Sequence, residues 1–357
     1  MSRKNGHSHP NQDRRGFLKA GGVATAALLT QAVPARVAHG QTVRESSAAP
    51  PGAMPTRNLG QTGHRVGIFS LGGQAAVERR DNAAVAVPLV ERALDLGVNY
   101  IDTSSIYGGP ERWSEQYIGQ VMKRRRAEAF LASKTRERTR DDSLRMLEQS
   151  LKLLNTDHLD LWQIHDIGMP REVDSIFAKG GAMEALLEAR EQKMVRFLGV
   201  TGHHRPDALM EALRRFPFDC ILLAVNAADA HHFSFMQQLV PMAVERQMGI
   251  IGMKIPARGR ILSSFRPPPP EQQRRTWEEG VVTSGPGMID MREAMYYTLS
   301  LPVSTVIIGC DSVAQLEENV RLAREFTPLS PAQMAALESR TAPVSKQALF
   351  FRFYERA

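Results

Sequence analysis

Eight short apolar runs, separated by amphipathic stretches of helical period, constrain the fold of this chain more than any other feature of its 357 residues. The runs are Val66–Leu71, Val98–Ile101, Phe130–Ser133, Leu159–Ile164, Phe197–Val200, Cys220–Val225, Ile250–Met253 and Val303–Ile308. Continuous apolar strands that alternate with helices indicate a parallel sheet covered on both faces. Eight such units in about 270 residues predict an α/β protein with a closed (β/α)8 TIM barrel.

The segments between these runs are predicted to be helices, and they are Ala83–Leu96, Glu111–Arg125, Arg140–Leu154, Ala182–Lys193, Pro206–Phe216, Phe235–Gln247, Met288–Ser300 and Ser312–Phe326. Two other segments fall outside the alternation. Thr56–Arg65 contains two turn glycines and predicts an N-terminal hairpin at the bottom of the barrel. Arg258–Gly287, the long loop after strand 7, is either a lid or substrate loop or a disordered insertion.

The first 40 residues have the order of an export signal. Arg14-Arg15 opens a twin-arginine pattern, Ala20–Val33 is uncharged and rich in small residues, and Ala38-His39-Gly40 resembles a cleavage site. The apolar stretch is too short to span a bilayer, so we expect no stable membrane anchor. The sequence predicts a signal peptide over 1–40, recognition by the twin-arginine export machinery and a periplasmic or otherwise exported protein. A disordered tail with a chance arginine pair is the alternative.

The remaining chain is predicted to consist of a linker over 41–55, a barrel over 56–329 and a helical tail over 330–357. The formal net charge of the whole chain is +7, and +5 of it belongs to residues 1–40, with six Lys or Arg against one Asp, which leaves +2. This small charge excludes an argument for nucleic-acid binding. The two cysteines, Cys220 and Cys310, lack metal-ligand spacing and are expected to be small buried residues, with a disulfide permitted but not required.

Four polar residues stand at or just after the ends of successive predicted strands. Asp102 and Tyr107 follow the second, Lys134 ends the third and His165 ends the fourth. In a barrel the carboxyl ends of all strands face one mouth, so these side chains should converge. A lysine ammonium lowers the pKa of a neighbouring phenol, which is about 10 when unperturbed, and an aspartate holds the ammonium in place. Singly they read as a helix cap, a loop aromatic, a surface lysine and a core histidine; together they predict a carbonyl-polarising proton donor.

On these residues the chain resembles the aldo/keto reductase family, over nearly all of Thr56–Leu329. The matching blocks are Asn99–Thr103 with Tyr107-Gly108, Ala132–Thr135, Leu159–Leu161 with His165, Val195–Gly202, and Ile308–Asn319. The resemblance implies a reductase of aldehydes or ketones, or an alcohol dehydrogenase in reverse, that uses a nicotinamide cofactor. Tyr107 would be the acid, Lys134 and Asp102 would tune it, and His165 would orient a small carbonyl or sugar-like substrate.

The resemblance also implies cofactor contacts, with departures at the nicotinamide end. Thr201-Gly202 stands where the family has Ser-Asn, so Thr201 or His203 would substitute. Leu222 replaces the usual Gln, while Asn226 is kept. Lys254 and Arg258 are expected partners of the pyrophosphate, or else solvated cations.

At strand 8 the implied contacts lie at a helix start, where backbone N–H groups can hold a phosphate, and they are Gly309, Ser312, Gln315, Glu318 and Asn319. Gln315 stands where some members carry an Arg for the 2′-phosphate, and Glu318 and Asn319 match adenine contacts. NADP(H) is the cofactor that the resemblance implies. Asp311 adds a negative charge nearby, so NAD(H) is not excluded.

Two other functions remain open. A nucleotide-binding redox sensor or accessory protein without turnover would keep the barrel but would not need Tyr107 and Lys134. A metal-dependent hydrolase would use the pairs His203-His204 and His231-His232, which follow strands 5 and 6. Because no carboxylate or cysteine pattern accompanies these pairs, we expect no metal there. The loops Ile167–Gly180 and Arg258–Gly287 should set the substrate specificity.

Overall fold

The computed structural model describes residues 53–267, 269 and 285–352. Two compact units divide the chain, Met1–Ala48 and Ala49–Ala357, and every described residue belongs to the second. The predicted signal peptide and nearly all of the predicted linker lie outside the described residues. Their export function therefore stays a prediction.

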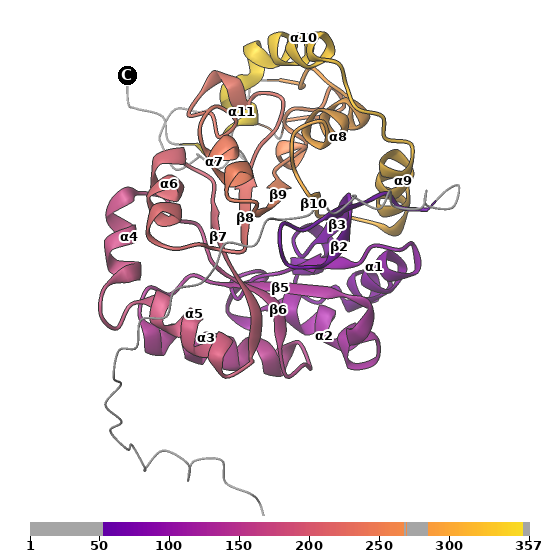
Figure 1. The fold of residues 1–357 in the computed structure, drawn as a ribbon. Coiled ribbons are helices and arrows are strands. Elements are labelled where there is room, and N and C mark those ends of the chain that lie inside the picture. The colour runs from indigo at the N-terminus through magenta and orange to yellow at the C-terminus, as the bar shows by residue number, and fades with distance from the viewer. Residues whose placement is uncertain (1–52, 268, 270–284, 353–357) are drawn as a thin grey trace, which may run out of the picture. The chain divides into compact units, whose positions relative to one another are not determined.

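A closed barrel of parallel strands forms the centre of the second unit, in the order β10-β3-β4-β5-β6-β7-β8-β9 (Figure 1). The strands are β3 (Phe69–Gly72), β4 (Tyr100–Asp102), β5 (Phe130–Thr135), β6 (Leu159–Ile164), β7 (Val195–Gly202), β8 (Cys220–Ala224), β9 (Gly249–Met253) and β10 (Thr305–Ile308). Parallel pairing runs around the ring and closes where Val306 faces Phe69. The predicted (β/α)8 barrel is confirmed.

The N-terminal hairpin takes part of the first predicted strand. Strands β1 (Thr56–Asn58) and β2 (Arg65–Gly67) pair antiparallel, with Arg57 opposite Val66, so the apolar run Val66–Leu71 is shared between the hairpin and β3. The Asn99 side chain fixes the boundary, because its Oδ1 accepts from the Gly67 N–H at 2.9 Å and its Nδ2 donates to the Arg65 carbonyl at 2.8 Å. The prediction of one continuous strand from Val66 was wrong at this point.

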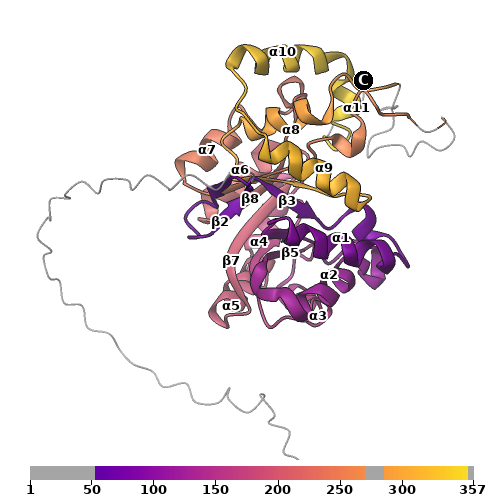
Figure 2. The same cartoon turned by 90° about the vertical axis from the view of Figure 1, so that its right-hand side faces the viewer.

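Helices lie outside the strands and cover them, as the two views show (Figures 1 and 2). They are α1 (Ala83–Asp95), α2 (Trp113–Arg125), α3 (Arg140–Leu153), α4 (Pro170–Phe177), α5 (Ala182–Glu191), α6 (Pro206–Arg215), α7 (Leu239–Glu245), α8 (Met291–Leu299) and α9 (Val313–Arg324). Helix α4 lies inside Ile167–Gly180, where the sequence predicts a loop. Pro170 occupies its first turn, where a missing N–H costs nothing, and Val173 and Ile176 bury its apolar side. No helix of the described residues is long and apolar enough to cross a membrane.

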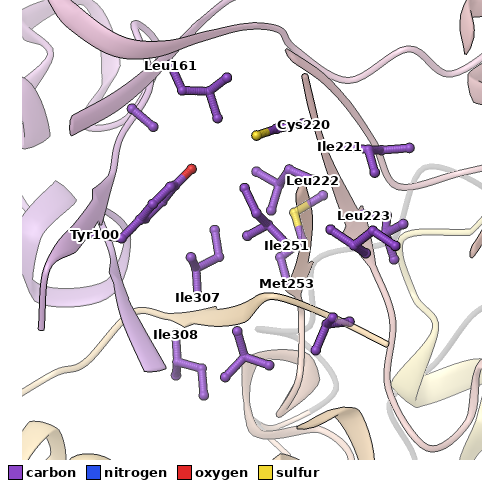
Figure 3. Close-up of a cluster of buried hydrophobic side chains, with 14 of the residues drawn as sticks. Tyr100, Leu161, Cys220, Ile221, Leu222, Leu223, Ile251, Met253, Ile307 and Ile308 are labelled. Atoms are coloured by element: carbon purple, nitrogen blue, oxygen red, sulfur yellow. The ribbon is translucent and has the colours of Figure 1, made fainter. Parts of the chain in front are cut away.

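Apolar side chains fill the barrel. Tyr100, Leu161, Leu222, Ile251 and Ile307 from five different strands belong to one buried cluster (Figure 3). Because parallel strands covered on both faces present apolar residues to both, nearly every strand position here is buried. This packed interior leaves polar chemistry to the strand ends.

The chain after the barrel returns to the strand ends. Helices α10 (Pro331–Thr341) and α11 (Ser345–Ala348) follow α9. The Thr341 hydroxyl donates to the Ala227 carbonyl at 2.8 Å, and Gln347 Nε2 donates to the carbonyls of Arg260 and Gly285 at 2.7 and 2.8 Å. The C-terminal segment thus packs on the loops after β8 and β9.

Candidate active site

A buried ion pair joins the ends of β4 and β5. Lys134 Nζ donates to Asp102 Oδ2 at 2.5 Å and to the Thr103 carbonyl at 2.7 Å. Both side chains are 1% exposed, and strand pairing sets Asp102 opposite Ala132, two residues before Lys134. Burial raises the pKa of Asp102 and lowers the pKa of Lys134, while the charge of each partner opposes these shifts. The two charges are therefore held in place by each other.

Tyr107 lies over this pair from the loop after β4. Lys134 Nζ is 5.0 Å from the centroid of its ring, and the ring meets that of His165 edge to face, with centroids 5.9 Å apart. Gly108 makes the tight turn possible, because it has φ 87° and a Cβ there would lie 2.6 Å from the Trp113 backbone nitrogen. The four predicted catalytic side chains are thus brought together.

The pKa of the Tyr107 phenol shifts in the direction opposite to the expected one. Burial raises the pKa of the Tyr107 phenol well above its usual value, Asp102 adds to the rise, and Arg258 is the cation that lowers it. Lys134 was expected to lower this pKa; its ammonium is paired with Asp102 at 2.5 Å, and the burial of the phenol raises the pKa nonetheless. Tyr107 is consequently a protonated phenol at neutral pH, which is the state that a proton donor needs.

His165 is a neutral imidazole held by a residue that the sequence analysis missed. The Ser104 hydroxyl lies 2.9 Å from His165 Nδ1 and accepts the Ile106 N–H at 3.5 Å, and we assign its own proton to the bond with Nδ1. Burial, with Lys134 second, lowers the pKa of His165 well below its usual value. The ring proton therefore sits on Nε2, which can donate a hydrogen bond. The signal for Ser104 was its place in the polar run directly after β4.

A second cluster lies at the ends of β6 and β7. Asp166 Oδ1 is 2.8 Å from His203 Nδ1 and 3.3 Å from His204 Nε2. The Asp166 backbone has φ 58°, and its N–H donates to Thr201 Oγ1 at 2.8 Å. The imidazoles, led by His203, hold the pKa of Asp166 far below its usual range in spite of burial, and burial lowers the pKa of His203 to about 4. The cluster is an ionised carboxylate beside a neutral His203.

The predicted nicotinamide contacts are engaged within the protein. Thr201 is fully buried and holds the Asp166 turn through its hydroxyl. Asn226 Oδ1 accepts from the Ala228 N–H at 2.9 Å, while its Nδ2 donates to the carbonyls of Lys254 at 3.2 Å and Ala348 at 3.5 Å. Leu222 lies in the apolar cluster of the barrel (Figure 3). Among the predicted nicotinamide contacts, Thr201 Oγ1 and both ends of the Asn226 amide already make hydrogen bonds within the protein.

Cations gather on the segment after β9. Lys254 Nζ donates to Gln74 Oε1 at 3.2 Å, and burial with the nearby Arg258 lowers its pKa to about 8. Arg258 is exposed and makes no hydrogen bond or ion pair within the described residues. Lys254, Ala257 and Arg258 all have positive φ, between 49° and 62°. Residues other than glycine with positive φ raise the free energy of the folded state, and they are concentrated at ligand sites.

The residues predicted to contact the adenosine end lie around the start of α9. Ser312 caps the helix and accepts the Gln315 N–H at 3.2 Å, and Gln315 Oε1 accepts the Asp311 N–H at 2.6 Å. A Cβ on Gly309 would lie 3.1 Å from the Gln74 carbonyl oxygen, so only a glycine packs there without displacing its neighbour.

Three more interactions complete this end. Glu318 is exposed and paired with Arg321 at 2.7 Å, and buried Asn319 donates to Cys310 Sγ at 3.4 Å. Arg79, which the sequence analysis did not single out, pairs with Asp311 at 2.5 Å. The charge of Asp311 is therefore balanced by a cation.

A nicotinamide dinucleotide fits this mouth at its diphosphate. Positive charge for an anion comes from three places, namely Arg258, which has no partner among the described residues, Lys254, whose one bonded partner among them is a neutral amide, and the start of α9. Thr201 and Asn226, the predicted carboxamide contacts, are bonded within the protein, while His203 Nε2 has no bonded partner among the described residues. The residues present therefore match the anionic part of the cofactor better than the predicted carboxamide contacts.

The other sequence hypotheses concern the histidine pairs and the cysteines. Within the described residues, no group of three or more His, Cys, Asp or Glu side chains is arranged to hold a metal. His231 Nε2 lies 2.8 Å from the Glu338 carbonyl, whereas His203 Nδ1 lies 2.8 Å from Asp166 Oδ1. Cys220 and Cys310 are free and buried, and burial raises the pKa of both thiols, that of Cys310 to about 12.

Comparison with known proteins gives one consistent result. The model of the aldo/keto reductase family matches residues 65–341. An uncharacterized oxidoreductase, YqkF of Bacillus subtilis, is 23% identical over 81% of this chain and 97% of its own. L-galactose dehydrogenase of Arabidopsis thaliana is 27% identical over 81% of this chain and 94% of its own. The holo form of the aldo-keto reductase AKR11C1 from Bacillus halodurans superposes with a TM-score of 0.65, at 24% identity, over 81% of this chain and 96% of its own.

Proposed function

Because the chain belongs to the aldo/keto reductase family, we propose that it reduces an aldehyde or ketone, or oxidises the corresponding alcohol, with Tyr107 as the proton donor. The observation that carries this proposal is the convergence of four side chains on one mouth. Lys134 is bonded to Asp102 at 2.5 Å and lies 5.0 Å from the Tyr107 ring centroid, and that ring meets His165 at 5.9 Å. A donor and a hydrogen-bonding group on one side of a carbonyl are what acid-assisted reduction needs.

Each of the converging side chains has a defined role in the proposed reaction. His165 Nε2 donates to the substrate oxygen and orients it, since its Nδ1 is taken by Ser104 at 2.9 Å. Tyr107 then gives its phenolic proton to the oxygen as negative charge develops there. The Lys134 ammonium, fixed by Asp102, stabilises the phenolate that Tyr107 becomes. In the oxidising direction the same proton returns to Tyr107.

The cofactor, when bound, supplies or accepts the hydride. Lys254 and Arg258 would hold its diphosphate as cations of the loop after β9. We propose NADP(H) as the cofactor, with NAD(H) as the alternative. Arg79 supports NADP(H), because this cation stands at the start of α9 near Gln315 and could turn from Asp311 to a 2′-phosphate.

The substrate class rests on the relatives and on the site. L-galactose dehydrogenase acts, by its name, on a sugar. A small carbonyl or sugar-like compound is thus the proposed substrate class. Export by the twin-arginine route is a separate proposal, which rests on Arg14-Arg15, the uncharged stretch Ala20–Val33 and the cleavage-like Ala38-His39-Gly40. Its test is the location of the protein when both arginines are replaced by Lys.

Turnover of carbonyl compounds by the purified protein tests the proposed function. NADPH and NADH should each be offered with a panel of aldehydes, ketones and sugars, and the loss of reduced nicotinamide followed by absorbance. Tyr107→Phe should lose this turnover and keep NADPH binding. Binding without turnover in both proteins would instead support a nucleotide-binding sensor.

A further inference from the structure

His203 is held as firmly as the predicted catalytic residues, although no step of the proposed reaction uses it. Its Nδ1 lies 2.8 Å from Asp166 Oδ1, and Asp166 is fixed in turn by the bond from its own N–H to Thr201 Oγ1 at 2.8 Å. Asp166 follows His165 directly in the chain, so the two imidazoles belong to neighbouring positions at the mouth. The His203 side chain is 13% exposed and opens to solvent.

The partner of Nδ1 decides which ring nitrogen of His203 carries the proton. Asp166 is ionised, with Arg136 3.7 Å from its other oxygen, and a carboxylate can only accept hydrogen bonds. His203 must therefore donate from Nδ1, and the neutral ring has a bare lone pair on Nε2. Within the described residues nothing donates to that nitrogen.

His165 has the opposite polarity. With Ser104 assigned as the donor to its Nδ1, its Nε2 carries the proton and donates. One mouth thus presents an N–H from His165 and a lone pair from His203. A ligand that bonds both imidazoles needs an oxygen that accepts from His165 and a neighbouring group that donates to His203.

We propose that His203 accepts a hydrogen bond from a hydroxyl group of the substrate, on a carbon near the carbonyl that His165 and Tyr107 engage. The substrate class is then that of hydroxylated carbonyl compounds, in place of simple aldehydes or ketones. This inference rests on the proposed function and narrows it. A substrate carboxylate or phosphate does not fit, because it would face the lone pair of Nε2 and the Asp166 charge behind it.

A pair of substrates and a pair of variants test this inference on the full-length protein. Glyceraldehyde and propanal have the same carbon chain and differ in their hydroxyl groups. His203→Asn keeps a side-chain N–H for Asp166 but removes the acceptor at Nε2. His158→Asn is the matched control, because His158 also bonds an aspartate through Nδ1, to Asp157 at 2.7 Å, but precedes β6 at the opposite end of the strand.

The expected readout is the ratio of kcat/KM for glyceraldehyde to that for propanal. It should exceed one in the natural protein and fall about tenfold in His203→Asn, the size expected for one hydrogen bond between neutral groups. His158→Asn should leave the ratio unchanged. Titration of NADPH by fluorescence should give the same Kd for His203→Asn and the natural protein.

Three results would overturn the inference. The first is an equal preference for the two substrates in the natural protein, and the second is an unchanged ratio in His203→Asn. The third is a raised Kd for NADPH with both substrates affected alike, which would assign Nε2 to the nicotinamide carboxamide. A protein that turns over neither compound, nor any other carbonyl, would instead refute the proposed function itself.

Discussion

Lys134 Nζ lies 2.5 Å from Asp102 Oδ2, and both side chains are shielded from water. Removal of one partner leaves an unpaired charge in a buried place, which costs about 3 to 5 kcal/mol of stability. Lys134→Met should therefore lower the free energy of unfolding by about that amount in a urea titration. The double variant Asp102→Asn with Lys134→Met should recover most of the stability and none of the turnover. A double variant that loses the sum of what the two single variants lose would show that the two charges do not depend on each other.

The second buried ion pair, Arg352 with Asp229, ties the C-terminal segment to the loop after β8. Both side chains are fully buried, and the guanidinium also lies 3.8 Å from the Phe235 ring centroid and donates to the Ala224 carbonyl at 2.9 Å. Arg352→Met should lower the free energy of unfolding by about 3 to 5 kcal/mol. The matched variant Arg321→Met, which removes two exposed pairs, should have a much smaller effect. Similar Tm values for both variants would contradict this account of the C-terminal segment.

Lys254 should make cofactor binding depend on pH. Its pKa is lowered to about 8, so its ammonium is present below pH 8 and lost as the pH rises through that value. Because the diphosphate is an anion, the Kd for NADPH should rise up to about tenfold between about pH 7 and 9, the size of one charge-assisted hydrogen bond. Lys254→Arg keeps its charge over this range and should show a flat profile. A natural protein with a flat profile would remove Lys254 from the diphosphate site.

Asp311 should influence the choice between NADPH and NADH. It pairs with Arg79 at 2.5 Å near the start of α9. Asp311→Asn frees Arg79 for a 2′-phosphate, so the ratio of the Kd for NADH to that for NADPH should rise by a few-fold. Arg79→Gln should lower the same ratio, and fluorescence titrations of both cofactors measure it. Opposite shifts would place the 2′-phosphate elsewhere.

The barrel could be predicted because the residues of each strand show by themselves that the strand is buried. Each apolar run and each amphipathic segment carries its own period, and these periods alone are enough for the eight strands and for most helix bounds. Helix α4 was missed because eight residues between Gly168 and Gly180 are too short for a clear period. The first strand was misjudged because the boundary at Gly67 depends on Asn99, 32 residues away.

The convergence of the catalytic side chains could also be predicted from the sequence, whereas the hydrogen bonds of the predicted cofactor contacts could not. Asp102, Lys134 and His165 lie at strand ends, so their convergence follows from the barrel itself. Asn226 and Thr201 look available in the sequence, but their polar groups are bonded to Ala348 and Asp166, which only the folded chain brings near. Likewise, the charge that Lys134 presents to Tyr107 depends on how closely Asp102 approaches it.

Tyr107→Phe tests the central claim most directly. The Tyr107 hydroxyl has no hydrogen-bond partner among the described residues, so its removal should leave the stability and the Kd for NADPH unchanged. The measurement is kcat for reduction of the best carbonyl substrate with NADPH, in the natural protein and in the variant. Loss of the proton donor should lower kcat about a hundredfold or more. A variant that binds NADPH normally and retains the kcat of the natural protein would contradict the assignment of Tyr107 as proton donor.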